Sequence, residues 1–202
     1  DGEVQKTVDY PVYFRNVAKD KLPGEGSKVS LWATNLSQSI NPGWVIILTP
    51  LVVAFFTFLR SRKKEPSTPT KIAFGLLISA LSVLVMIAAV NMGANGTEKV
   101  SVWWLVANYG VITIGELFLS PMGLSVVSKL SPTNITSLMM GGWFLSTSIG
   151  NKLSGVLASL WDIYDNKQDF FWVNFGLLMF ATMLMFVLLK QLNKVMQEKG
   201  IH

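Results

Sequence analysis

The 202-residue chain contains no cysteine, and its only histidine, His202, is the last residue. The absence of cysteine excludes disulfide bonds, thiolate metal sites and a cysteine nucleophile. With one terminal histidine, a histidine-based zinc cluster and a histidine-based catalytic triad are excluded as well. We therefore predict no catalytic residues, no metal site and no enzymatic activity.

Charged residues are also scarce. Asp, Glu, Lys and Arg make up 14% of the chain, whereas hydrophobic residues make up 50%. A soluble domain carries roughly a quarter charged residues, so this chain has few groups with which to solvate a surface. The hydrophobic residues come in long blocks and not in amphipathic stripes. These features predict an integral membrane protein in contact with a lipid bilayer.

Five hydrophobic runs are long enough to cross a bilayer as helices. At 1.5 Å per residue, about 20 residues span a hydrocarbon core of roughly 30 Å. Helices are expected because they satisfy their own backbone hydrogen bonds inside lipid. We predict an all-α membrane fold with transmembrane helices at residues 43–60, 72–93, 102–128, 137–161 and 170–190.

The basic residues between these runs predict the orientation. Nine of them flank one set of run ends and two flank the other: Arg60, Arg62, Lys63, Lys64, Lys71, Lys129, Lys190, Lys194 and Lys199 against Lys99 and Lys167. Cytoplasmic loops carry an excess of Lys and Arg, so the richer side is expected in the cytoplasm. Residues 1–40 then form an external segment, 41–190 the transmembrane domain and 191–202 a cytoplasmic tail. These loops account for the net charge of +5, and we predict no nucleic-acid partner.

One carboxylate, Glu116, lies in the middle of the third run. At 100° per residue it shares one arc of the predicted helix with Tyr109, Thr113, Ser120 and Gly123. A charge at that depth costs at least about 2.5–3.5 kcal/mol on insertion scales, so Glu116 is expected to face protein or a water-filled cavity. The carboxylate then has either a functional or a structural role.

Lys152 in the fourth run is the partner available for a structural role. Counted at 1.5 Å per residue from the two run ends, it lies within about 6 Å of Glu116 in membrane depth. An ion pair between Glu116 and Lys152 is one interpretation, and a carboxylate that meets a ligand is the other.

The first and fourth runs carry packing signals. In the first run we expect Pro42 to start the helix and Pro50 to kink it. In the fourth run Trp143 is either a core or lipid-facing filler or the aromatic wall of a pocket. Small residues recur there at every fourth position and predict a ridge for close helix packing: Gly142, Ser146, Gly150, Ser154 and Ala158.

Three motifs in this order resemble the proton-coupled oligopeptide transporter family, a branch of the major facilitator superfamily. They are "QSINP" at 38–42, "GELFLSPMGLSVVSKLSP" at 115–132 and "MMGGWFLSTSIGN" at 139–151. The resemblance implies a twelve-helix fold of two halves, of which this chain holds helices eight to twelve as a C-terminal half-bundle. It explains the odd number of spans and the start without Met, so we expect a fragment whose N-terminal half is a missing partner.

The resemblance also implies a function. It indicates a multi-pass symporter of the cell membrane, inner or plasma, that imports di- and tripeptides by alternating access, with protons as the coupling ion and no other cofactor. Glu116 matches the carboxylate that meets the peptide ammonium, and Asn41 matches a position that contacts the peptide backbone. Trp143 and Ser146 match the cavity lining. Ser120, on the arc of Glu116, completes the predicted substrate site.

One residue departs from the family pattern, and other functions stay open. Lys152 stands where we expect a bulky neutral residue, and it could pair with Glu116, bind a substrate carboxylate or extend to the interface. The alternatives to peptide transport are a transporter of another small solute, such as nitrate, a peptide-like drug or a nucleoside, and a non-transport membrane subunit.

Overall fold

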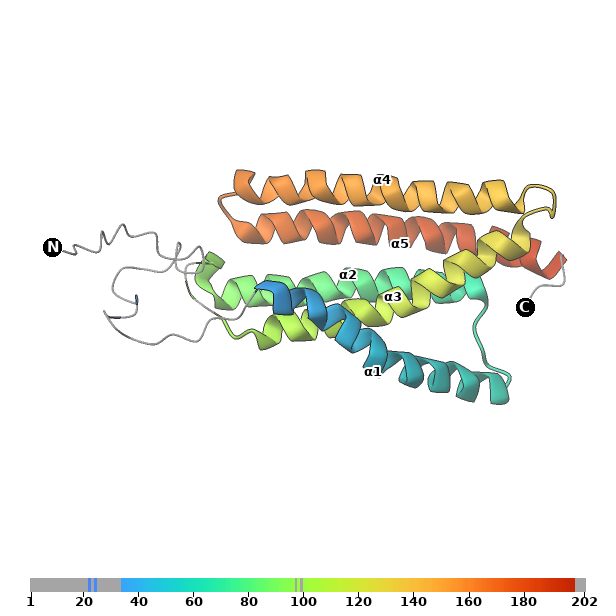
Figure 1. Cartoon of the computed structure of the whole chain (residues 1–202), viewed down its shortest axis with the longest axis horizontal. Coiled ribbons are helices and arrows are strands. Elements are labelled where there is room, and N and C mark those ends of the chain that lie inside the picture. Colours follow the sequence, from blue (N-terminus) through green and yellow to red (C-terminus); the bar gives the residue numbers. More distant parts are fainter. Residues whose placement is uncertain (1–21, 23, 25–33, 97, 99, 199–202) are drawn as a thin grey trace.

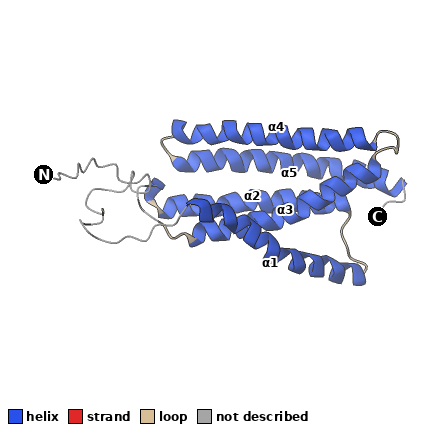
Figure 2. Cartoon of the chain, viewed as in Figure 1, coloured by secondary structure: helices blue, strands red, loops and turns tan. Residues whose placement is uncertain are grey.

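The computed structural model describes residues 22, 24, 34–96, 98 and 100–198, and all regular secondary structure in this part is helical (Figures 1 and 2). The predicted all-α fold is therefore confirmed. The elements are α1 (Thr34–Ser61), α2 (Thr68–Met92), the short 3-10 helix η3 (Ala94–Gly96), α3 (Trp103–Leu130), α4 (Thr136–Ile163) and α5 (Lys167–Glu198).

The five α-helices run up and down between two ends of the molecule. Figure 1 shows the α1–α2 loop, the α3–α4 turn and the end of α5 at one end. The start of α1, η3 and the α4–α5 turn lie at the other. The basic loops that the sequence assigns to one side therefore do lie together, and we call this side the basic end.

Helix α2 lies at the centre and makes its most extensive contacts with α3 and then with α5. Small residues allow the first of these contacts. A Cβ atom added at Gly115 of α3 would lie 2.3 Å from the Ser79 hydroxyl oxygen and 2.8 Å from the backbone oxygen of Gly75. Because lipid is as apolar as the helices, close van der Waals packing of this kind stabilises membrane bundles.

Helix α1 begins at Thr34, earlier than the predicted start at residue 43. The expectation that Pro42 starts the helix is wrong, because Pro42 and Pro50 both lie inside α1. The polar first turns were missed because hydropathy detects only the apolar part of a helix, whereas a helix can extend beyond it into polar surroundings. Figure 1 shows α1 changing direction along its length, in agreement with the predicted kink.

Among the described residues, four helices are long and apolar enough to cross a membrane: Leu36–Ser61, Thr68–Met92, Trp103–Leu130 and Lys167–Glu198. Large apolar side chains on them are exposed, as lipid-facing residues are. Ile46 is 76% and Val187 74% exposed. Helix α4 has the necessary 28 residues but carries many Ser, Thr and Gly residues, and it is not among the four. Its role as a fifth span stays a prediction.

The small-residue ridge of α4 does not pack within the described part of the chain. All five of its residues are exposed, from Gly142 to Ala158. A Cβ atom at Gly142 or Gly150 would have no neighbouring heavy atom within 4 Å. Among the described helices, small residues pack closely between α2 and α3 instead, a contact that no pattern noted in the sequence predicts.

Candidate functional site

Glu116 lies on the face of α3 that meets α1. The side-chain amide of Asn41 donates a hydrogen bond of 3.0 Å to the Glu116 carboxylate, across 75 residues of sequence. Both side chains are half-buried. Two residues from separate motifs, both predicted to belong to a substrate site, are therefore in direct contact.

Thr113 orients this pair. Its side chain is fully buried, and its hydroxyl lies 2.6 Å from the backbone oxygen of Tyr109 and 3.2 Å from the side-chain oxygen of Asn41. A hydroxyl carries one hydrogen, which the two acceptors share. Because the amide oxygen of Asn41 faces this hydroxyl, the amide nitrogen faces Glu116.

Trp44 anchors α1 to α3 one helical turn after Asn41. Its indole nitrogen donates a 2.9 Å hydrogen bond to the backbone oxygen of Val106. The ring lies over Gly110, where a Cβ atom would be 3.2 Å from it. Residues three apart share a helix face, so Asn41 and Trp44 hold the same side of α1 against α3. Sequence reasoning missed Trp44, although a glycine on the facing helix was an available signal.

The remaining predicted site residues lie farther along α3 and on α4. Trp143 is half-buried and packs on Gly123, where a Cβ atom would be 2.2 Å from the indole ring. Gly123 is seven residues after Glu116, about 10 Å along the helix. Ser120 and Ser146 are exposed, and the Ser146 hydroxyl donates a 2.7 Å hydrogen bond to the backbone oxygen of Trp143. Trp143 also lines a pocket of about 690 Å³ with Leu138 and Met139.

Lys152 is exposed on α4. Among the described side chains no ion pair joins it to Glu116, whose carboxylate accepts the Asn41 hydrogen bond instead. The pairing of Lys152 with Glu116 stays a prediction.

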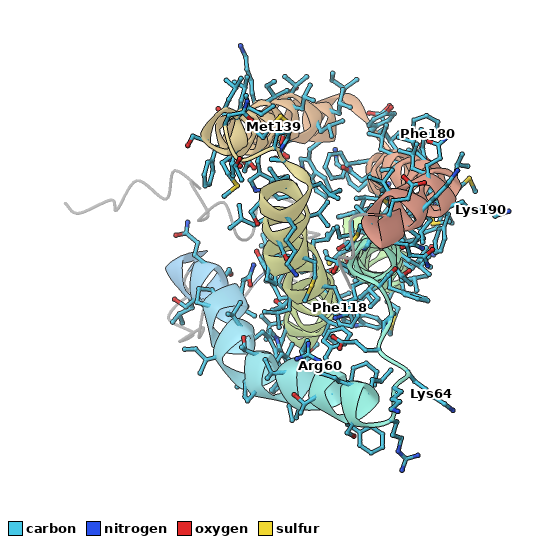
Figure 3. The ribbon with its side chains drawn as sticks, turned by 90° about the vertical axis from the view of Figure 1, so that its right-hand side faces the viewer. Arg60, Lys64, Phe118, Met139, Phe180 and Lys190 are labelled. Atoms are coloured by element: carbon cyan, nitrogen blue, oxygen red, sulfur yellow. The ribbon has the colours of Figure 1, made fainter. Side chains whose placement is uncertain are left out.

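A second polar cluster lies at the basic end, which faces the viewer in Figure 3. Glu65, in the α1–α2 loop, accepts hydrogen bonds from Arg60 at 2.6 Å and from Lys71 at 2.5 Å. These hydrogen bonds lower the pKa of Glu65 to about 2. The Lys71 ammonium is buried and also lies 4.4 Å from the centre of the Phe56 ring. From the sequence, Lys71 was expected only as one of the basic residues that flank the spans, and its contacts with Glu65 and Phe56 were not predicted.

Neither cluster is a metal site. Within the described ranges, no group of three or more His, Cys, Asp or Glu side chains could hold a metal ion.

Curated relatives of the chain include dipeptide and tripeptide permeases. Dipeptide and tripeptide permease A of Proteus mirabilis is 36% identical over 132 residues, which are 65% of this chain and 26% of that protein. The permease of the same name from Escherichia coli is 35% identical over the same shares. This chain thus spans about a quarter of the length of these relatives. They are transporters and not enzymes.

Solved structures of transporters share the fold. A POT family transporter in complex with a thioalcohol-conjugated peptide superimposes with a TM-score of 0.71 at 25% identity, over 90% of this chain and 36% of the other. The peptide transporter POT in complex with sulfate gives a TM-score of 0.69 at 30% identity, over 78% and 31%.

The sequence profile of the POT family matches residues 33–173, which include α1 to α4 and all the predicted site residues. The match covers well over half of the chain and agrees with the resemblance carried by the three motifs. The chain is a multi-pass membrane protein that belongs to the POT family.

Proposed function

We propose that this chain forms part of a proton-coupled symporter that imports di- and tripeptides, and that Glu116 meets the ammonium group of the peptide. The observation that carries the proposal is the hydrogen bond from Asn41 to Glu116. The names of the relatives, which are dipeptide and tripeptide permeases, support the choice of substrate.

The geometry suits an ammonium ligand. In the present arrangement one Glu116 oxygen accepts from the Asn41 amide, so the carboxylate keeps further acceptor positions. An ammonium donates up to three hydrogen bonds. Its positive charge also offsets the energetic cost of keeping a charged carboxylate inside the membrane. The Asn41 side chain, which Thr113 orients, then contacts the first peptide group of the same ligand.

Transport requires the part of the protein that this chain does not contain. The 132 matched residues make up 26% of the Proteus mirabilis permease, and we assign the N-terminal half of the full-length protein as the partner of this five-helix half-bundle. The two halves rock about the substrate site and expose it alternately to either side, as in other repeat-built transporters. In this scheme protons are the coupling ion, the basic end and the C-terminus face the cytoplasm, and the protein resides in the inner or plasma membrane.

A second candidate substrate is a small amino compound other than a peptide. A POT family transporter that is 28% identical and superimposes with a TM-score of 0.67 was solved in complex with 5-aminolevulinic acid. This molecule shares an amino group and a carboxylate with short peptides, so the ammonium site proposed for Glu116 serves either class.

The proposal is tested with the full-length transporter in vesicles and the variant Glu116→Gln. Glutamine keeps the size and can still accept from Asn41, but it removes the charge. Dialanine uptake should fall about 10- to 100-fold, the range expected when a hydrogen bond to a charged group is lost. Wild type should also reject N-acetyl-dialanine, which lacks the ammonium, and the variant should lose this discrimination.

Glu198→Gln is the matched control. Glu198 is a carboxylate in an exposed pair with Lys194 at 3.9 Å, and its removal should leave uptake unchanged. If Glu116→Gln takes up dialanine as wild type does and still discriminates against the acetylated peptide, the assignment of Glu116 is wrong. Uptake of 5-aminolevulinic acid in preference to dialanine by the wild type would favour the second candidate.

A further inference from the structure

A cavity of about 1050 Å³ opens at the basic end of the molecule. Three segments that are distant in sequence form it: residues 60–71, the last turns of α3 and the last turns of α5. Lys129 on its wall follows Glu116 by 13 residues, about 20 Å along α3, so the basic part of the cavity lies away from the carboxylate proposed to meet the peptide.

The lining of this cavity is strongly basic. Four basic residues, Arg60, Lys63, Lys71 and Lys129, face one acidic residue, Glu65, which leaves a formal charge of 4 − 1 = +3. Glu65 holds Arg60 and Lys71. Lys63 and Lys129 are exposed, and neither forms an ion pair with a carboxylate in the described part of the chain.

The start of α2 adds to this positive field. Ser67 and Thr68, at the first turn of α2, line the cavity, and the first turn contains no acidic residue. The N-terminus of a helix carries a partial positive charge, which favours an anion, although Pro69 in this first turn has no N–H to donate. The Ser67 hydroxyl donates a 2.7 Å hydrogen bond to the side-chain oxygen of Asn193, so α5 fixes the position of this helix end.

We propose that this cavity binds a phosphate group, that of an anionic lipid headgroup, with Lys63 and Lys129 as its cationic ligands. The position of the cavity supports a lipid source, because it lies where three apolar membrane-spanning helices end. Basic pockets between helices at this level of a membrane bind phosphate headgroups. Free phosphate offers the same chemistry, and the experiment separates the two sources. The proposal is independent of the peptide site.

The backbone at Lys63 provides a clean variant. Lys63 has a φ of 55°, in the left-handed region, directly after α1. The Lys64 N–H bonds across it to the backbone oxygen of Leu59 at 2.9 Å, as in a helix-ending turn that normally uses glycine. Lys63→Gly therefore removes the ammonium and relieves the backbone, so loss of binding would not reflect misfolding.

The experiment measures phosphatidylglycerol and phosphatidylcholine bound to the purified full-length transporter by native mass spectrometry. Wild type should retain phosphatidylglycerol in preference to phosphatidylcholine. Each lysine removed should weaken phosphatidylglycerol binding about fivefold, so Lys63→Gly with Lys129→Gln should weaken it roughly 25-fold. A second arm adds inorganic phosphate, which should not displace the lipid at equal concentration.

Lys64→Gln with Lys190→Gln is the matched control, because it removes the same charge from the same end without touching the cavity lining. Figure 3 shows Lys190 at the outer edge of α5, pointing away from the bundle and away from Arg60. This control should bind lipid as wild type does. Equal loss in both double variants, or equal binding of both lipids by wild type, overturns the proposal. If inorganic phosphate displaces phosphatidylglycerol from the wild type but not from the Lys63/Lys129 variant, the cavity is a phosphate site for the free ion and not for a lipid headgroup.

Discussion

In each of the two polar clusters, a single side chain sets the orientation of its neighbours. The hydroxyl of Thr113 faces the oxygen of the Asn41 amide, so that the nitrogen is directed to Glu116. At the basic end, Glu65 plays a comparable part between Arg60 and Lys71. Thr113 thus sets the orientation of Asn41, and Glu65 sets that of Arg60 and Lys71. Buried polar groups need hydrogen-bond partners, so a single partner can fix the position of a neighbouring side chain.

Glu65 makes the stability of the basic end depend on pH. Its pKa falls from 4.5 to about 2 in the folded protein. A carboxyl group with a lowered folded-state pKa stabilises the fold above its unfolded pKa, and this contribution is lost as the pH falls through the folded value. We therefore expect a loss of stability between pH 4.5 and about pH 2 that Glu65→Gln does not show.

The measurement is the melting temperature of the detergent-solubilised full-length transporter from about pH 6 to about pH 2, a range that includes the interval over which the Glu65 contribution is lost. Other carboxylates titrate in wild type and variant alike, so the difference between the two curves isolates Glu65. Glu198→Gln, which removes a weak exposed pair, should follow the wild-type curve. Parallel curves for wild type and Glu65→Gln would contradict the assignment.

Among the helices, the contact between α2 and α3 sets the direction in which Glu116 of the proposed substrate site points. Gly115 faces α2 and lies against Ser79 and Gly75. Glu116 is the next residue, 100° farther around the helix, and so it faces α1. A glycine contact that touches no substrate thus determines which helix the carboxylate meets.

Gly115→Ala should therefore damage both stability and transport. The new Cβ would lie 2.8 Å from the Gly75 backbone oxygen, so α3 has to shift. Overpacking of this kind costs roughly 1–3 kcal/mol. The melting temperature and the dialanine uptake of the full-length protein should both fall.

Gly176→Ala on α5 is the control, because a Cβ there has no neighbour within 4 Å. It should leave stability unchanged or raise it, since alanine favours a helix by about 1 kcal/mol over glycine. An unchanged melting temperature in Gly115→Ala would show that α3 accommodates the methyl group without moving.

For the molecule as a whole, the small-residue ridge of α4 is unpaired within the described helices. Gly150, at its centre, has open space around it. Because the matched residues make up only 26% of the length of the Proteus mirabilis permease, we expect the rest of the transporter to pack on this ridge.

Gly150→Leu should accordingly destabilise the full-length transporter by roughly 1–3 kcal/mol and reduce uptake. Gly155→Leu is the same change on the same helix, 140° around it, and it also meets open space in this chain. It should have the smaller effect on the melting temperature. Equal effects of the two substitutions would argue against a partner on the ridge.

The sequence by itself determined the membrane class, the five helices and their up-and-down order. Lipid imposes these features directly, because a span must be apolar, about 20 residues long and satisfied in its backbone hydrogen bonds. The motif resemblance also placed Asn41 and Glu116 in one site. The helix start at Thr34 escaped prediction, since polar turns carry no hydropathy signal.

Only the tertiary structure decided which residues meet. Membrane depth predicted Lys152 as a partner for Glu116, but depth follows from chain position, whereas contact depends on how each helix is rotated. The close packing at Gly115 sets that rotation and turns Glu116 toward Asn41. The structure also buries Lys71 against Glu65 and Phe56, although the place of this lysine beside a basic loop predicts an exposed cation.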